Sequence, residues 1–281
     1  MVLESLIGPF RAEQHPLWLF LFGIIFATVG VLMALWVFQE HASLVLVFFT
    51  TMAAIPLIHR TYLFEEKKDV KREHLSIWEH DRAILFFVFL TLGMTVAFTV
   101  WYVFLPTDVG QSAFSVQADT IRSLNAQVTG RVASIGMLAK IVLNNLKVLT
   151  LSLLFSFIYG SGVAFILTWN ASVIATAAGN FIRERIGQYT HGAGLSQASA
   201  YFYVGSLSFF RYAIHGVPEI ISYMIGGLVG GLLSFLFVRG VYKQQNFERL
   251  LLHASDLLFL ALGVLIFAAL LEVYVTPVFF A

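Results

Sequence analysis

The sequence predicts an all-α polytopic membrane protein, a transmembrane helix bundle of about seven spans with one amphipathic interfacial helix. Of the 281 residues, 59% are apolar and only 12% are charged, whereas a soluble domain is about half apolar and a quarter charged. Apolar runs long enough to cross a bilayer core of about 30 Å recur along the chain. This composition argues against a soluble enzyme or a disordered protein, and a net charge of +1 gives no basic field for nucleic acid.

Seven apolar runs are predicted to cross the membrane. They cover residues 17–38, 43–58, 83–104, 142–169, 170–182, 220–238 and 257–275. The first run is too long for a signal-peptide core, so we expect a retained span. The run 170–182 is short and rich in small residues, which indicates a full or half span; if it does not cross, the count falls to six. Residues 199–214 are apolar but short, and their relation to the membrane stays open.

The basic residues predict the orientation of these spans. With the N-terminus inside, Arg11, six Lys or Arg of 59–82 and three of 239–253 lie on one side, which makes ten against six on the other. Because basic residues favour the cytoplasmic side, we expect a multi-pass protein of the cell membrane with its N-terminus in the cytoplasm and its C-terminus outside.

The segments between spans divide the chain into three parts. Residues 1–58 form an N-terminal transmembrane hairpin, 59–82 a charged cytoplasmic helical linker, and 83–281 the main membrane domain. In the linker, six basic and six acidic residues alternate, which is typical of a solvated helix.

An amphipathic helix of some 25 residues is predicted after the third span. Its apolar face carries Phe114, Ile121, Leu124, Val128, Val132, Ile135 and Leu138, and its polar face carries Gln117, Asp119, Arg122, Gln127 and Arg131. We expect an interfacial elbow that leads into the fourth span. A partner-binding surface on the polar face is the alternative.

Four ionisable residues lie in or beside apolar runs, where a charge must be paired or hydrated: Lys147, Arg211, His215 and Glu219. Pro218 is typical of a first helical turn, so the sequence predicts a helix start there, with His215 folding back toward Glu219. The favoured interpretation is a structural latch closed by Lys147 or Arg211. The alternative is an acid/base pair or half of a metal site. Because Cys is absent and no further ligand has metal-site spacing, no metal or cofactor is predicted.

The run 220–238 contains two overlapping GxxxG patterns. Gly226 and Gly230 form one frame, and Gly227 and Gly231 form the other. Such frames allow close helix approach, either within the chain or in a homo-oligomer.

The order of these motifs resembles the stage II sporulation protein M family. An Asn-Asn-Leu-Lys segment, Asn144–Lys147, opens a span that ends in Gly160-Ser161-Gly162. Asn170 follows with its small-residue helix, and then His215-Gly216-x-x-Glu219 precedes the glycine-rich span. The resemblance covers roughly residues 83–275 and leaves the N-terminal hairpin as an extra feature.

The resemblance implies a membrane scaffold. In spore-forming bacteria the family member is a scaffold for peptidoglycan-degrading enzymes during engulfment, and His215 and Glu219 are a family signature rather than known catalytic residues. We therefore expect a non-enzymatic scaffold or assembly factor for cell-envelope processes, with the lipid bilayer and other membrane or envelope proteins as partners. The alternatives are a transporter or permease subunit for a small molecule or lipid and an intramembrane hydrolase. Against the hydrolase, the sequence offers no nucleophile and no second set of ligands.

Overall fold

The computed structural model describes residues 16–71, 80–126, 135–159, 161–189, 196–238 and 247–279. Every regular element in these ranges is helical. The elements are α3 (Pro16–Val37), the 3₁₀ turn η1 (Gln39–His41), α4 (Ala42–Lys71), α5 (Asp81–Phe104), α6 (Thr107–Ala113), α7 (Ser115–Ala126), α8 (Ile135–Tyr159), α9 (Val163–Gly187), α10 (Gln197–Val238), α11 (Phe247–Leu270), the π-helix η5 (Leu271–Val275) and α12 (Thr276–Phe279). Seven helices in the described ranges are long and apolar enough to span a membrane, which confirms the predicted fold class.

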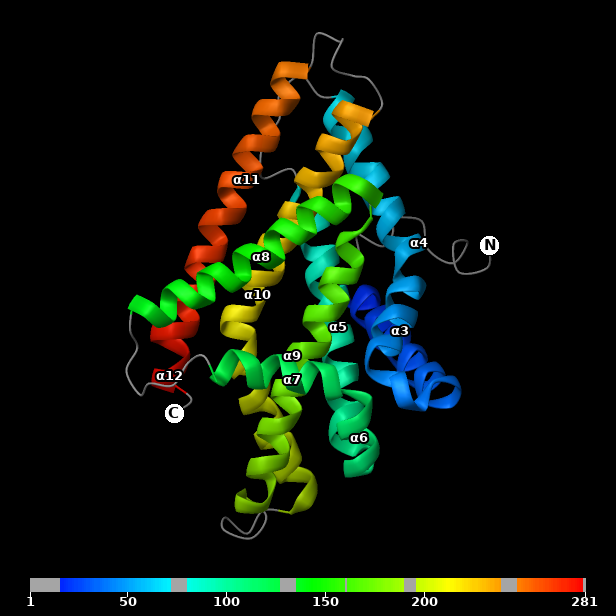
Figure 1. Cartoon of the computed structure of the whole chain (residues 1–281), viewed down its shortest axis with the longest axis vertical. Helices are drawn as coiled ribbons and strands as arrows, with labels where there is room; N and C mark the ends of the chain where they lie inside the picture. Colours follow the sequence, from blue (N-terminus) through cyan, green and yellow to red (C-terminus); the bar gives the residue numbers. More distant parts are fainter. Residues whose placement is uncertain are drawn as a thin grey trace.

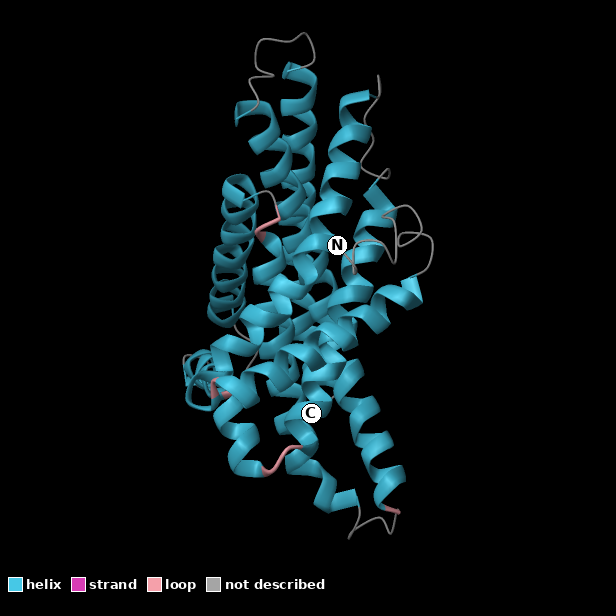
Figure 2. Ribbon diagram, turned by 90° about the vertical axis from the view of Figure 1, so that its right-hand side faces the viewer, coloured by secondary structure: helices cyan, strands magenta, loops and turns pink. Residues whose placement is uncertain are grey.

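The long helices form an elongated bundle in which α10 occupies a central position (Figure 1). α10 packs against α8, α9, α11 and α5, while α3 packs against α4 and α5. The short helix α7 lies across the long axis of the bundle, and Figure 2 shows the same elongated form from the side.

The apolar run 142–169 was expected to be one span, and this prediction is wrong. The chain turns at Ser161 and Gly162, so α8 ends at Tyr159 and α9 begins at Val163. A Cβ on Gly162 would collide with the backbone carbonyl of Phe155. Only glycine allows the chain to turn back so tightly here. α9 is then a span of 25 residues, and residues 170–182 are its middle rather than a separate short span.

The predicted helix start at Pro218 is also wrong. Residues 199–214 and 220–238 belong to one continuous helix of 42 residues, α10, with Pro218 inside it. At about 1.5 Å per residue this helix is about 63 Å long, roughly twice the hydrocarbon core. Proline lacks the N–H that would bond to the carbonyl one turn earlier. Membrane helices accommodate such a gap when neighbouring helices surround it.

The predicted amphipathic helix is shorter than expected. Its N-terminal part forms α7, the C-terminal positions 135–138 belong to α8, and residues 127–134 lie outside the described ranges. On α7, Asp119 and Arg122 are exposed and form a 2.9 Å ion pair, as their polar face predicts.

Gln117, which was assigned to the same polar face, is fully buried. The Ser43 hydroxyl donates to its side-chain oxygen at 2.7 Å, and its amide nitrogen donates to the Ser43 carbonyl at 3.0 Å and the Ser172 hydroxyl at 3.2 Å. These three bonds fasten α7 to α4 and α9. They supply the partners that a buried amide requires.

Candidate functional site

The signature residues His215 and Glu219 lie one turn apart on the same part of α10 and contact two different neighbouring helices. The amide nitrogen of Asn145, on α8, donates to Glu219 Oε1 at 2.6 Å. His215 Nδ1 lies 3.2 Å from the Thr276 hydroxyl, at the start of α12. The expected contact between His215 and Glu219 is therefore replaced by two contacts that join α8, α10 and α12.

The hydroxyl of Thr276 defines the direction of its bond with His215. Thr276 donates its one hydroxyl hydrogen to the carbonyl of Leu271 at 3.1 Å. Because a hydroxyl has a single hydrogen, it must accept from the imidazole, which makes His215 Nδ1 the donor. The histidine thus acts as a hydrogen-bond donor to the C-terminal segment.

A second carboxyl group, that of Glu272, completes this polar cluster. Glu272 lies in η5, one turn before Thr276, and its carboxyl group interacts electrostatically with that of Glu219. Tyr223, one turn beyond Glu219 on α10, is buried. We define the polar cluster as Asn145, His215, Glu219, Tyr223, Glu272 and Thr276. π-helical turns such as η5 are frequent at functional sites.

The other predicted site residues lie around this cluster or apart from it. Asn144 donates to the side chain of Asn145 at 3.3 Å, while Lys147 is exposed on α8. Arg211 stacks over the ring of Phe181, 5.1 Å from its centroid. Asn170 bonds to the carbonyl of Ile166 within its own helix at 3.1 Å. The hydrogen-bond partners of Glu219 and His215 are thus Asn145 and Thr276, and the structural latch stays a prediction.

Two glycines of α10 beyond the signature lie against α8. A Cβ on Gly230 would collide with the Leu153 carbonyl and lie 3.0 Å from the backbone nitrogen of Phe157. A Cβ on Gly226 would collide with the side chain of Leu149. This frame therefore brings the backbones of α8 and α10 together inside the chain. In the other frame, Gly227 is buried and Gly231 is partly buried.

Sequence reasoning missed Glu272, Thr276 and Tyr223. A usable signal existed for Glu272, because it is the only charged residue in the last apolar run and intramembrane acids mark functional sites. Thr276 and Tyr223 carry no comparable signal, since both residue types are ordinary in spans. Among the described residues, no group of three or more His, Cys, Asp or Glu side chains could hold a metal ion.

The fold and the cluster define a polytopic α-helical membrane protein with a polar contact between its central and C-terminal spans. The Stage II sporulation protein M family matches residues 82–277. Because this match covers more than half of the chain, the protein belongs to that family. The matched region contains every residue of the polar cluster and excludes α3 and α4. Neither the curated proteins nor the solved structures include a significant match.

Proposed function

We propose that this protein is a non-enzymatic membrane scaffold or assembly factor for cell-envelope processes. Its membership of the sporulation protein M family supports this function. The observation that carries the proposal is that the two signature residues form hydrogen bonds with two different neighbouring helices. Glu219 receives a bond from α8, and His215 donates to α12. Side chains committed to neighbouring helices hold those helices in register, as a scaffold requires.

The chemistry of the cluster also favours a structural role. Asn145 offers an amide, and Thr276 donates its hydroxyl hydrogen to the Leu271 carbonyl rather than to His215, so His215 is not placed to act as its base. Burying the acid Glu219 without a donor would leave an unsatisfied charged group, and Asn145 supplies that donor at 2.6 Å. In this proposal, α8, α10 and the C-terminal segment present one fixed surface to other envelope proteins.

Substitution of Glu219 separates a structural role from a reactive one. Glu219→Gln retains an acceptor for Asn145, so it should unfold close to wild type, whereas Glu219→Ala leaves the Asn145 amide unpaired and should lose about 1–3 kcal/mol of stability. Thermal unfolding in detergent and complementation of a deletion strain are measured on the same variants. Glu40→Ala, which removes an exposed acid from η1, is the matched control. A folded Glu219→Gln protein that fails to complement contradicts the structural role.

Co-purification from native membranes tests the scaffold itself. A peptidoglycan-degrading or other envelope enzyme should co-purify with wild type and with Glu219→Gln, and should be lost with Glu219→Ala in proportion to its loss of folded protein. Recovery of a stoichiometric ATPase instead would contradict the scaffold.

A transporter or permease subunit is the second candidate, and one observation favours it. Two acidic residues, Glu219 and Glu272, lie within candidate membrane spans, where acidic side chains mark ion pathways. Under this function Glu219→Gln and Glu272→Gln would each abolish solute or ion flux in reconstituted vesicles without changing the melting temperature. Unchanged flux in both variants would exclude it.

A further inference from the structure

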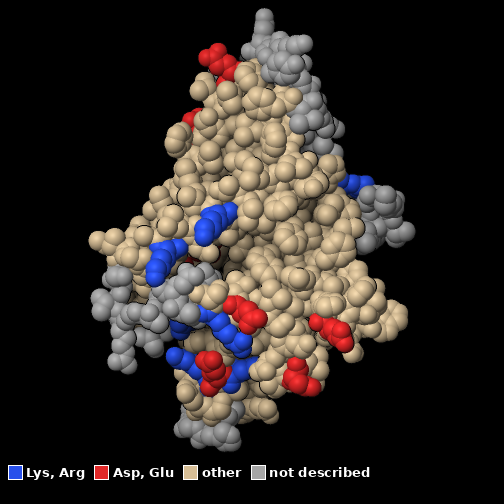
Figure 3. Space-filling view, viewed as in Figure 1, with Lys and Arg blue, Asp and Glu red and all other residues tan. Residues whose placement is uncertain are grey.

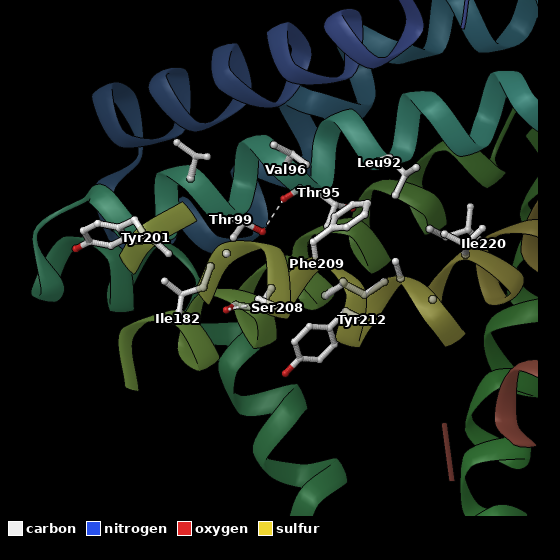
Figure 4. A pocket seen from close by; sticks show the side chains of 18 of the residues that line it. Leu92, Thr95, Val96, Thr99, Ile182, Tyr201, Ser208, Phe209, Tyr212 and Ile220 are labelled. Carbon is white, nitrogen blue, oxygen red and sulfur yellow. Dashed lines mark hydrogen bonds between the residues drawn. The ribbon is translucent and has the colours of Figure 1, made fainter. Parts of the chain in front are cut away.

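An apolar groove lies on the side of α10 that faces α5 and α9 and contains none of the polar cluster. Its volume is about 240 Å³. Leu92, Val96, Ile182, Tyr201 and Ile220 lie along it (Figure 4). The lining comes from three helices that all qualify as membrane spans. Bilayer lipid is therefore the medium next to this groove.

Two glycines of α10 create the hollow. A Cβ on Gly205 would meet no atom within 4 Å, and a Cβ on Gly216 would meet only Ile174 Cδ1, at 3.5 Å. Helix packing therefore does not require glycine at position 205, in contrast to Gly230. Glycine inside a helix is less stable than alanine by about 0.5–1 kcal/mol, and its missing side chain leaves the groove open at this position.

The polar groups of the lining are already bonded to the backbone. Thr95 and Thr99 donate to the carbonyls four residues earlier, at 2.9 and 2.8 Å. Ser208 donates to the Ala178 carbonyl at 3.1 Å, and Tyr212 to the Ala177 carbonyl at 3.2 Å. A ligand in this groove thus meets methyl, methylene and aromatic surface, which is the surface that a hydrocarbon chain requires.

The groove is longer than one leaflet is deep. It extends along α5 from Leu92 to Phe104 and along α10 from Tyr201 to Ile220, which is about 18 Å and about 28 Å at 1.5 Å per residue. One leaflet contributes about 15 Å of hydrocarbon depth, half of the bilayer core. The end at Phe104 and Tyr201, whose rings lie 5.3 Å apart, is followed by the polar helices α6 and α7. Aromatic residues are enriched at this level of the membrane.

Two arginines lie beside the groove. Arg185 and Arg211 both stack on the ring of Phe181, 4.7 and 5.1 Å from its centroid. Arg211 also stacks over Tyr212, a lining residue, and Arg185 lies about one turn beyond the lining residue Ile182. Basic and acidic side chains lie together in the lower part of the molecule (Figure 3). The guanidinium groups complement the phosphate of a lipid whose chain lies in the groove.

We propose that this groove binds one acyl chain of an anionic glycerophospholipid, with its phosphate beside Arg185 and Arg211. The site is thus a lipid site within the family domain that does not depend on the scaffold function. It lies beside the polar cluster, because the ring of its lining residue Tyr212 packs edge-on against His215 with 6.2 Å between the ring centroids.

Photo-crosslinking tests the site directly. The full chain is reconstituted in vesicles of phosphatidylcholine and phosphatidylglycerol that carry a diazirine on one acyl chain, and labelled peptides are mapped by mass spectrometry. Label should concentrate on residues 92–104 and 201–220. The reference for bulk lipid is the label on Phe259 and Phe267 of α11, which are 74% and 55% exposed, and labelling of the groove should exceed it. Equal labelling of all exposed helices would overturn the proposal.

Two variants provide a matched comparison. Gly205→Phe fills the groove, and Gly263→Phe places the same side chain at an exposed glycine of α11 that also has no atom within 4 Å. We expect groove labelling to fall about tenfold in the first, equivalent to about 1.4 kcal/mol, and to persist in the second. If Gly205→Phe does not fold, Gly205→Leu fills the same space with a smaller side chain. Unchanged labelling in a folded filling variant would contradict the site.

The nature of the ligand is tested with three probes at equal molar fraction. Diazirine phosphatidylglycerol should label the groove about fivefold more than diazirine phosphatidylcholine, and Arg185→Gln should reduce this preference. Equal labelling by both lipids, or stronger labelling by a diazirine fatty acid, would contradict an anionic phospholipid. Protection of the groove by a second polypeptide would assign it to a partner helix and overturn the proposal.

Discussion

Replacing Gly230 with alanine tests whether the backbones of α8 and α10 are in direct contact. The new methyl group would collide with the Leu153 carbonyl and lie 3.0 Å from the Phe157 nitrogen. Both are backbone atoms of α8, so no side-chain rotation relieves the overlap. The two helices must separate, and the Asn145–Glu219 bond lies between the same two helices.

The expected magnitude follows from comparison of three glycines. Overpacking costs about 1–3 kcal/mol, and exchanging helical glycine for alanine returns about 0.5–1 kcal/mol. The net loss of stability for Gly230→Ala should therefore lie within about 0–2.5 kcal/mol. Gly226→Ala should lose less, because its methyl group meets the end of the Leu149 side chain, which can move. Gly263→Ala should gain up to about 1 kcal/mol, since no atom lies within 4 Å of its Cβ.

Unfolding in detergent or bicelles, followed by circular dichroism or by the melting temperature, measures this series. From most to least stable, the order should be Gly263→Ala, wild type, Gly226→Ala and Gly230→Ala. If Gly230→Ala is as stable as Gly263→Ala, the close approach of α8 and α10 is wrong. The two glycine frames are compared by replacing both glycines of one frame with Leu. If the Gly227 and Gly231 double variant loses as much stability as the Gly226 and Gly230 double variant, the second frame also packs tightly.

Two further predictions concern topology and the crossing helix. Because the chain has no native Cys, a single Cys at position 69 or 119 reports on which side of the membrane that position lies. An impermeant reagent should label Asp119→Cys but not Asp69→Cys in intact cells. The reverse result would contradict the predicted orientation. Gln117→Ala leaves the Ser43 hydroxyl without its acceptor and should lose about 1–3 kcal/mol. Asp119→Ala on the exposed face should be neutral within about 0.5 kcal/mol; equal losses in these two variants would show that the Gln117 bonds do not stabilise the fold.

The fold class followed from the sequence because a long apolar run needs no tertiary partner to be recognised. The helix boundaries were harder to predict. Gly216 and Pro218 are strong breakers in soluble proteins, and they predicted a helix start where α10 in fact continues, because neighbouring spans rather than water surround it. Conversely, Ser161 and Gly162 end a helix within an uninterrupted apolar run, and the close contact that requires Gly162 exists only in the folded chain.

Only part of the candidate site could be predicted, because contacts between helices form only in the folded chain. His215, Glu219 and Asn145 could be selected because polar residues inside spans are conspicuous. The residues that they contact could not be selected, because the pairing of helices determines those contacts. His80 and His253 show the same limit: their Nε2 atoms lie 3.2 Å apart in a buried contact, although 173 positions separate them in the chain.

The contact between α3 and α5 has a consequence for how the protein is made. A Cβ on Gly23 would collide with the Leu90 carbonyl, and a Cβ on Gly93 would collide with the Phe20 carbonyl, so each helix fits the bare backbone of the other. α3 is synthesised first, and α4 and the residues that follow it must emerge before α5 can pair with it. During that interval the backbone surface around Gly23 faces lipid or the insertion machinery. Although α3 lies outside the family match, it contacts the backbone of the first helix of the matched region, and removing it would leave Gly93 without the helix that it fits.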